Sequence, residues 1–262
     1  MSYVCINCRR LFRDFRLSCP ECGGWRTFTG GREITLPEES RPVPLPEVIQ
    51  PEFSRVITNV HCVDTLLGGG FVRGSSVLLI GPPGAGKSTL LLQLFDRARL
   101  PGLYVTGEES IQQLKLRATR LNINAHTIAL FYETDVNKIL AHLNDNVPVL
   151  LVIDSIQTIY AGSSSSLPGT PTQIRRCAYL LRRASQEKEI VLVMIGQITK
   201  EKKAAGPKLL EHAVDVVLYL DADDGGGHHR VLQVTKNRFG PTSMSLSLRM
   251  TESGFQFPER KP

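Results

Sequence analysis

Long hydrophobic runs are missing from this sequence. No apolar stretch approaches the roughly 20 residues that a helix needs to cross a bilayer, so no membrane-spanning helix and no membrane partner are expected. The first five residues, Met-Ser-Tyr-Val-Cys, lack the hydrophobic core of a secretory signal. No internal repeat is present. These absences predict a cytoplasmic protein.

The size and charge of the chain set weaker limits. Its 262 residues can form one large α/β domain with a small appendage. The formal net charge is +6. A positive charge suits a polyanionic partner such as nucleic acid, but it serves solubility equally well, so charge does not decide between the two.

Cysteines are concentrated at the start of the chain. Two Cys-x-x-Cys pairs, separated by ten residues, lie within the first 22 residues: Cys5, Cys8, Cys19 and Cys22. Four thiolates at this spacing can surround Zn²⁺ in a tetrahedron. A redox pair usually stands alone, and iron–sulfur clusters generally show another spacing, so zinc is favoured. The remaining Cys62 and Cys177 have apolar surroundings typical of core thiols.

Basic and aromatic residues are interspersed with these cysteines. They are Arg9, Arg10, Phe12, Arg13, Phe15, Arg16, Trp25 and Arg26. The arginines can contact phosphates while the aromatic rings stack on bases. Alternatively, the rings pack against the metal knuckles. The sequence leaves both interpretations open.

Composition divides the chain into three parts. Residues 1–30 form the predicted zinc-binding knuckle, and residues 31–52 form a proline-rich linker with little periodic hydrophobicity. Residues 53–262 alternate short apolar runs with helical patterns and are predicted to form the main domain.

The main domain has the pattern of an α/β fold. Five apolar runs predict the buried strands of a mostly parallel sheet with helices on both faces: residues 77–80, 103–106, 149–153, 190–195 and 214–220. Ser110 and Gln113 form a capping box for one connecting helix, and Asp135 can cap the next. Alternation in residues 230–235 and 244–250 predicts antiparallel strands at one sheet edge.

A phosphate-binding loop lies between the first of these strands and an apolar helix. Its residues, with the first of the helix, are Gly81, Pro82, Pro83, Gly84, Ala85, Gly86, Lys87, Ser88 and Thr89. Glycines let successive backbone N–H groups surround a triphosphate, Lys87 can reach the outer phosphates, and the Ser88 hydroxyl can ligate Mg²⁺. A glycine-rich turn with a solvated lysine is the alternative, which the strand before and the helix after disfavour.

Acidic residues follow two other predicted strands. Asp154 ends residues 149–153 in the position of a magnesium-shell carboxylate, although a capping aspartate has a similar pattern. Glu108 and Glu109 follow residues 103–106. Glu108 is the predicted general base that orients the attacking water, and Glu109 alternatively serves that role or favours the next helix N-terminus.

Two further positions suggest contact with phosphate. Gln197 follows residues 190–195, where an amide can sense the γ-phosphate, though a packed structural glutamine is about as common. Lys236 and Arg238 alternate along a strand and therefore share a face. From spacing alone, a solvated strand face is favoured over a phosphate site.

Taken together, these motifs resemble the bacterial RadA (Sms) family of DNA-repair and recombination ATPases, which are RecA-like motors. The resemblance covers nearly the whole chain. Besides the four cysteines and the phosphate-binding loop, it rests on Leu67-Gly-Gly-Gly70, Val72-Arg-Gly-Ser75, Gly107-Glu-Glu-Ser110, Gln113-Leu-Lys-Leu-Arg117, Ile153-Asp-Ser-Ile-Gln157, Ala205-Gly-Pro-Lys208, Glu211-His212 and Lys236-Asn-Arg-Phe-Gly240. The last motif is the family's hallmark.

The resemblance implies a ring, usually a hexamer, that binds ATP between protomers. Lys236 and Arg238 would act across the interface on the neighbour's γ-phosphate. Loops after Tyr160 and Thr199 would line a channel for single-stranded DNA, with the basic residues Lys200, Lys202, Lys203 and Lys208 near the strand. It further implies helicase or branch-migration activity on single-stranded or branched DNA after DNA damage, with a recombinase or replicative helicase as partner.

Two departures from the family pattern matter. Typical members continue into a Lon-protease-like domain, whereas this chain stops at Pro262. Many have His at the position of Gln197, although RecA-like relatives have Gln there. A regulatory ATPase or a loader that binds a protein partner is the alternative function. The presence of Lys87, Glu108 and Asp154 argues against a non-catalytic adaptor.

Overall fold

We describe a computed structural model of the chain. The residues it describes are 2–5, 7–12, 18–24, 28–31, 44–48, 53–124, 126–162, 167–197, 207–222 and 227–258. The chain divides into two compact units, Met1–Glu52 and Phe53–Pro262, and each is treated by itself.

The first unit contains little regular structure in its described residues. A small antiparallel sheet has the order β2-β1-β3, formed by β1 (Ser2–Cys5), β2 (Leu11–Phe12) and β3 (Phe28–Gly31). A single 3₁₀ turn, η2 (Leu45–Glu47), follows a proline and has no buried residue. The described residues of this unit show one small sheet near the cysteine pairs, so a bound metal would supply much of its stability.

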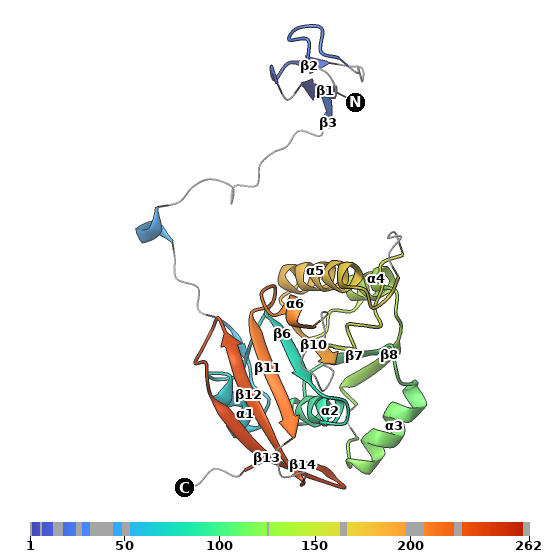
Figure 1. The fold of residues 1–262 in the computed structure, drawn as a ribbon, viewed down its shortest axis with the longest axis vertical. Helices are drawn as coiled ribbons and strands as arrows, with labels where there is room; N and C mark the ends of the chain where they lie inside the picture. Colours follow the sequence, from blue (N-terminus) through green and yellow to red (C-terminus); the bar gives the residue numbers. More distant parts are fainter. Residues whose placement is uncertain are drawn as a thin grey trace. The chain divides into compact units, whose positions relative to one another are not determined.

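The second unit is built on a nine-stranded sheet of order β14-β13-β12-β11-β6-β10-β9-β7-β8 (Figure 1). Its six parallel strands are β6 (Ser76–Gly81), β7 (Gly102–Thr106), β8 (Ile128–Tyr132), β9 (Leu150–Asp154), β10 (Val191–Gln197) and β11 (Val216–Ala222). Antiparallel strands extend one edge: β12 (His229–Asn237), β13 (Ser245–Thr251) and β14 (Gly254–Gln256). A separate short ladder joins β4 (Arg55–Val56) to β5 (Phe71–Val72). The predicted α/β class, with a mostly parallel sheet, is confirmed.

Helices cover both faces of this sheet. They are α1 (His61–Leu66), α2 (Lys87–Ala98), α3 (Ile111–Arg120), α4 (Val136–Asp145), α5 (Pro171–Glu187) and α6 (Pro207–Leu210). Alternation along β6 explains the two layers: Val77 and Leu79 face the core beneath α1 to α3, whereas Leu78 and Ile80 face α4 to α6. The central strands of the sheet are therefore buried on both sides.

Local signals in the sequence fix several boundaries. The Ser110 side chain accepts from the Gln113 backbone and the Gln113 side chain accepts in return, which is the predicted capping box of α3. Asp135 caps α4 through the Asn137 N–H. The five predicted apolar runs correspond to β6, β7, β9, β10 and β11. Strand β8 was not predicted, although its residues Ile-Ala-Leu-Phe-Tyr form a continuous apolar run; as an edge strand it is only partly buried.

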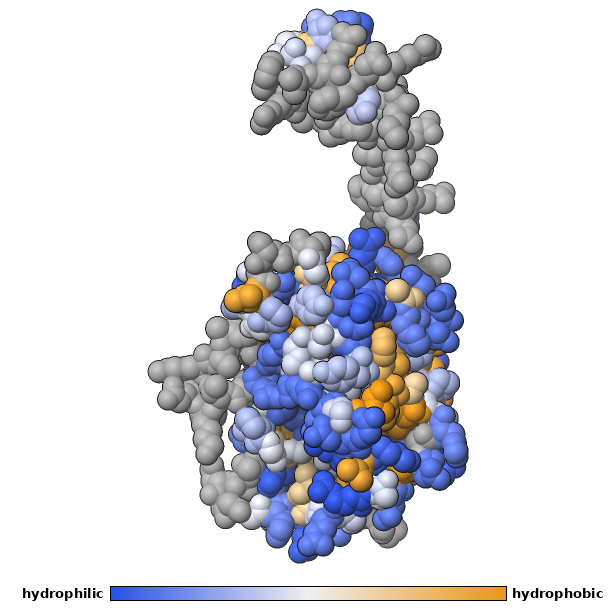
Figure 2. Space-filling model, turned by 90° about the vertical axis from the view of Figure 1, so that its right-hand side faces the viewer, coloured by the Kyte–Doolittle hydropathy of each residue, from blue (hydrophilic) through white to orange (hydrophobic). Residues whose placement is uncertain are grey.

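The surface of this unit is consistent with these layers. Figure 2 shows the side on which β8 and α3 lie, with mainly hydrophilic residues and one patch of hydrophobic ones. Among the described residues, no helix combines the length and the apolar character that a bilayer-spanning segment needs.

The topology gathers the predicted catalytic residues at one edge of the sheet. Strands β6, β7, β9 and β10 are parallel neighbours or near neighbours, so their carboxyl ends point the same way. In parallel α/β sheets this edge is where ligands bind. The phosphate-binding loop, Glu108, Asp154 and Gln197 all follow or end these strands.

Candidate nucleotide-binding site

The phosphate-binding loop connects β6 to α2 in a conformation that only glycine allows at one position. Gly86 is the N-cap of α2 and has a left-handed backbone with φ of 102°. A Cβ atom there would lie 2.3 Å from Met250 Cε and 2.9 Å from the Phe255 ring. The loop and the N-terminus of α2 thus present backbone N–H groups toward the site, as an anion requires.

Lys87 is buried at the first turn of α2. Its ammonium donates to the carbonyl oxygens of Gly81, at 2.8 Å, and Pro82, at 2.9 Å. Burial lowers the pKa of Lys87, and the charges of Asp154 and Glu108 act in the opposite direction. The ammonium therefore lies over the loop, close to where it could bind outer phosphates.

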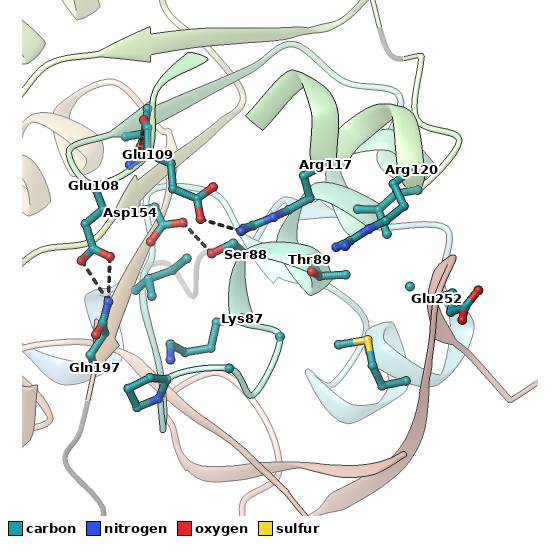
Figure 3. A pocket seen from close by; sticks show the side chains of 18 of the residues that line it. Lys87, Ser88, Thr89, Glu108, Glu109, Arg117, Arg120, Asp154, Gln197 and Glu252 are labelled. Carbon is teal, nitrogen blue, oxygen red and sulfur yellow. Dashed lines mark hydrogen bonds and ion pairs between the residues drawn. The ribbon is translucent and has the colours of Figure 1, made fainter. Parts of the chain in front are cut away.

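Asp154 and Ser88 supply oxygen ligands suited to magnesium. The Ser88 hydroxyl donates to Asp154 Oδ2 at 2.7 Å, so the residues from α2 and β9 meet directly (Figure 3). Tyr104 also donates its hydroxyl to this carboxylate. Burial, followed by the Asp154 charge, raises the pKa of Tyr104 well above its usual value, so the phenol remains a donor. A hydroxyl and a carboxylate at this spacing fit the hard Mg²⁺ ion.

The two neighbouring glutamates have different partners. Glu108 accepts from the Ser155 hydroxyl at 2.5 Å and, through its two oxygens, from Gln197 Nε2 at 2.9 and 2.8 Å. Glu109 instead pairs with Arg117 at 2.5 Å. Figure 3 shows Glu108 and Gln197 facing each other on one side of Lys87, with Glu109 directed to the arginine of α3. The geometry favours Glu108 over Glu109 as the candidate for the group that orients the attacking water.

These groups line one cavity of about 480 Å³. Glu108, Asp154 and Gln197 lie toward one end, while Arg120 and Glu252 lie toward the other (Figure 3), and Met250 also lines the cavity. The cavity also includes Pro83, Gly84 and Thr89 from the predicted set. A pocket with Lys87 and the carboxylates of Glu108 and Asp154 toward one end has the chemistry for a nucleoside triphosphate and its magnesium ion.

Several residues of the site were missed from sequence alone. In the sequence, Tyr104 and Ser155 have the pattern of ordinary strand and loop residues. In the structure, Tyr104 donates its hydroxyl to Asp154 and Ser155 donates to Glu108. The wall that β13 and β14 form was also missed. It is held by Gln93 of α2, whose amide accepts from Phe255 N at 2.7 Å and donates to Phe255 O at 3.2 Å. No local pattern indicates a contact that spans so much of the chain.

Lys236 and Arg238 lie outside this cavity. Arg238 is near the amino end of β6, whereas the cavity is at the carboxyl end of that strand. Lys236 donates to three carbonyl oxygens, those of Glu211 at 2.8 Å, His212 at 3.3 Å and Val214 at 2.7 Å. Arg238 donates to Asp215 Oδ1 at 3.1 Å. The structure brings these two cations close to each other and leaves them apart from the phosphate-binding loop of the same chain.

The predicted DNA-contacting lysines are not placed by the structure. Lys200, Lys202 and Lys203 fall outside the described residues. Lys208 belongs to α6, but its side chain is not among those described. Arg13, Phe15, Arg16, Trp25 and Arg26 of the cysteine-rich unit also lie outside the described residues.

The four N-terminal cysteines meet the requirements of a zinc site. Their sulfur atoms all lie within 4.8 Å of one another, with Cys5 to Cys22 and Cys8 to Cys19 each at 3.6 Å. Tetrahedral zinc, with Zn–S bonds of about 2.3 Å, requires sulfurs about 3.8 Å apart. Each pair forms a tight turn, in which Arg9 N donates to Cys5 O and Gly23 N to Cys19 O. These four thiolates would hold the ion.

The fold and the pocket define a P-loop nucleotide-binding protein with a RecA-like core. The model of the family described as "AAA domain" matches residues 41–203, which is more than half of the chain. The chain therefore belongs to the AAA domain family.

Within that class, the resemblance to RadA is confirmed. The chain is 39% identical to DNA repair protein RadA of Aquifex aeolicus (strain VF5) over 97% of its own length and 59% of the relative. It is 39% identical to DNA repair protein RadA of Bacillus subtilis (strain 168), over 96% of its length and 58% of that protein. The chain thus spans just under three fifths of the relatives it matches. Among solved structures, the RadB recombinase superposes with a TM-score of 0.60 at 26% identity, covering 78% of this chain and all of that one.

Proposed function

We propose that this chain is a DNA-dependent ATPase that works as a ring on single-stranded or branched DNA during recombination and repair. The proposal has three parts: ATP hydrolysis in the cavity, completion of that cavity by a neighbouring copy, and coupling to a DNA strand. Different observations support each part.

Support for hydrolysis comes from the arrangement of the pocket. Lys87 would bind the outer phosphates, Ser88 and Asp154 would hold Mg²⁺, and Glu108 would orient a water for in-line attack. Magnesium, when bound, would neutralise charge on the phosphate oxygens. Gln197 lies against Glu108 and directly precedes residues 198–206, so a change at the γ-phosphate can be passed to that segment.

The proposal of a ring rests on one observation: within one chain, the phosphate-binding loop and Arg238 lie at opposite ends of β6. The phosphate-binding loop follows the carboxyl end of β6, whereas Asp215, which holds Arg238, bonds Ser76 at its amino end. β6 has six residues, so its ends lie roughly 17 Å apart. An arginine side chain does not bridge that gap, and a phosphate contact by Arg238 therefore requires the nucleotide of another copy.

The DNA part rests on the similarity to DNA repair protein RadA and on charge. The net charge is +6, and Lys200, Lys202 and Lys203 are clustered in the segment directly after Gln197. In this proposal that segment, together with the loop after Tyr160, contacts the phosphates of a single strand. Zinc held by the N-terminal cysteines completes the cofactor set of ATP, Mg²⁺ and Zn²⁺. A recombinase or a replicative helicase is the proposed protein partner.

Binding to labelled single strands at two salt concentrations tests this function. A protein that neutralises several phosphates loses affinity steeply as salt rises, by about 10³-fold or more between 50 and 200 mM for six or more contacts. We expect that loss, together with an ATPase rate that rises when single strands are added. Absence of DNA binding, with ATPase activity responding only to a protein partner, would instead identify the regulatory ATPase.

A further inference from the structure

A buried carboxylate organises the amino-terminal edge of the sheet. The Asp215 side chain is only 6% exposed, and its Oδ2 accepts from Ser76 N at 3.0 Å and from Ser76 Oγ at 2.6 Å. These two bonds attach the loop before β11 to the first residue of β6. The carboxylate is therefore fixed in position, with Oδ1 left to face other groups.

Two arginines from distant parts of the chain meet at Oδ1. Arg238, which follows β12, lies at 3.1 Å, and Arg182, from α5, lies at 3.8 Å. One carboxylate cannot neutralise two guanidinium groups. Within the part of the chain that the structure describes, Arg182 Nε is buried and has no hydrogen-bond partner. A buried donor without a partner is costly, which points to a missing acceptor.

The surrounding charges leave this cluster short of negative groups. Lys236 lies close by, and its pKa is lowered first by burial and then by the Arg238 charge, with Arg182 acting in the same sense. Its ammonium donors are directed to the three carbonyls named above. The nearby Glu211 carboxylate accepts from the Tyr219 hydroxyl at 2.5 Å. The two arginines are thus the groups with donors left for an incoming anion.

Both arginines are accessible. The Arg238 side chain is 50% exposed and that of Arg182 is 29% exposed. Arg182 also lines a cavity of about 310 Å³, together with His212 and residues of α5 and α6. Guanidinium groups that contact a fixed carboxylate and are partly exposed to solvent suit bidentate binding of phosphate oxygens.

We propose that Arg182 and Arg238 form one anion site, positioned by Asp215, that binds the terminal phosphates of the nucleotide held by a neighbouring copy. This rests on the proposed function and adds Arg182 and Asp215 to a role that the family resemblance gives to Lys236 and Arg238. Arg182 contacts the phosphate, and Asp215 is a positioning residue that acts through the two arginines.

Single substitutions on α5 provide a matched comparison. Arg183 is adjacent to Arg182 but pairs with Glu187 on an exposed face, at 2.8 Å. We expect Arg182→Ala to lower the DNA-stimulated ATPase rate about tenfold or more, with nucleotide affinity of its own pocket unchanged, while Arg183→Ala keeps the full rate. Arg182→Lys should recover part of the loss. A full rate in Arg182→Ala would overturn the proposal.

Mixing two variants of low ATPase activity separates a contact in trans from a structural role. Subunits with Lys87→Ala lack a working phosphate-binding loop but keep both arginines. Subunits with Arg182→Ala keep the loop but lack one arginine. In a 1:1 mixed ring, about a quarter of the pockets combine an intact loop with intact arginines, so activity should return. Asp215→Asn subunits should be rescued in the same way. Lack of rescue for either variant would mean that its defect lies within its own fold.

The reference mixture is Lys87→Ala with Arg238→Ala. If this mixture regains activity and the Arg182 mixture does not, the inference on Arg182 is wrong while the proposed ring stands. If neither regains activity although the mass of the assembly is unchanged, the proposed shared pocket itself is wrong. Thermal unfolding of each variant confirms that the subunits are folded.

Discussion

The two ends of strand β6 carry the two groups of residues that we propose to be complementary halves of one catalytic site. At the carboxyl end, the phosphate-binding loop, Asp154 and Glu108 form a pocket whose charged groups each have a neutral hydrogen-bond partner. At the amino end, Asp215 holds two arginines that have donors left over. The difference is that one end has its polar groups satisfied within the chain, whereas the other keeps donors available, which in our proposal are for the nucleotide of another copy. A second copy would bring the halves together.

The largest loss of DNA-stimulated turnover should come from a substitution at either end of β6. We expect Lys87→Ala and Arg238→Ala each to reduce DNA-stimulated turnover by about 10³-fold or more, because one removes the lysine on the outer phosphates and the other the transition-state cation. They should differ in nucleotide binding. Titration with a fluorescent ATP analogue should show weakened binding in Lys87→Ala and normal binding in Arg238→Ala. Weak binding in Arg238→Ala would place this arginine in its own pocket.

The next comparison is within the carboxyl end, between the two adjacent glutamates. Glu108→Gln should lower kcat by about 10² to 10⁴-fold, as loss of a general base does. Glu109→Gln should cost far less, since Glu109 is engaged with Arg117 of α3. Single-turnover ATPase assays on both variants measure this. Equal losses would refute the assignment of Glu108.

A smaller effect on ATPase activity is expected when the cysteine-rich unit is altered, because that unit contributes no residue to either end of β6. Cys19→Ser should release zinc to a chromophoric chelator and leave the unfolding temperature of Phe53–Pro262 and the basal ATPase rate unchanged. Cys177→Ser is the converse control, because Cys177 lies on the buried face of α5. It should retain zinc and destabilise the ATPase unit by about 1 kcal/mol. A fall in ATPase stability in Cys19→Ser would contradict the separation of the units.

The smallest effect concerns the capping box that begins α3. Ser110→Ala removes the side-chain acceptor of the Gln113 N–H and should lower the free energy of unfolding by about 1 kcal/mol. Urea denaturation followed by circular dichroism would measure this as a lower midpoint with an unchanged slope. Thr119→Ala, on the exposed last turn of the same helix, should have less effect.

Sequence patterns predicted what depends on neighbours along the chain. The capping box, the phosphate-binding loop and the apolar runs of β6 and β9 are local, so hydrophobic periodicity and turn chemistry identified them. Contacts between distant segments left no such pattern. Gln93 with Phe255, and Arg182 with Asp215, join residues from separate elements that only the folded sheet brings together. The edge strand β8 was missed for a different reason, because Ile128–Tyr132 is a continuous apolar run and the local signal was present.

The same reasoning applies to the proposed catalytic set. The carboxyl ends of parallel strands were predictable as a site because the topology alone collects them. From spacing alone, a solvated strand face was the favoured interpretation of Lys236 and Arg238. Their significance depends on Asp215, which fixes Arg238 at the amino end of β6, and on the length of that strand.

The most direct test of the shared pocket is the ATPase rate per subunit measured over a dilution series, alongside the mass of the assembly, with and without single-stranded DNA. The account predicts that the rate per subunit falls toward zero as the ring dissociates and that DNA stimulates only the assembled form. A monomer that hydrolyses ATP at the full rate, with no response to DNA, would contradict it.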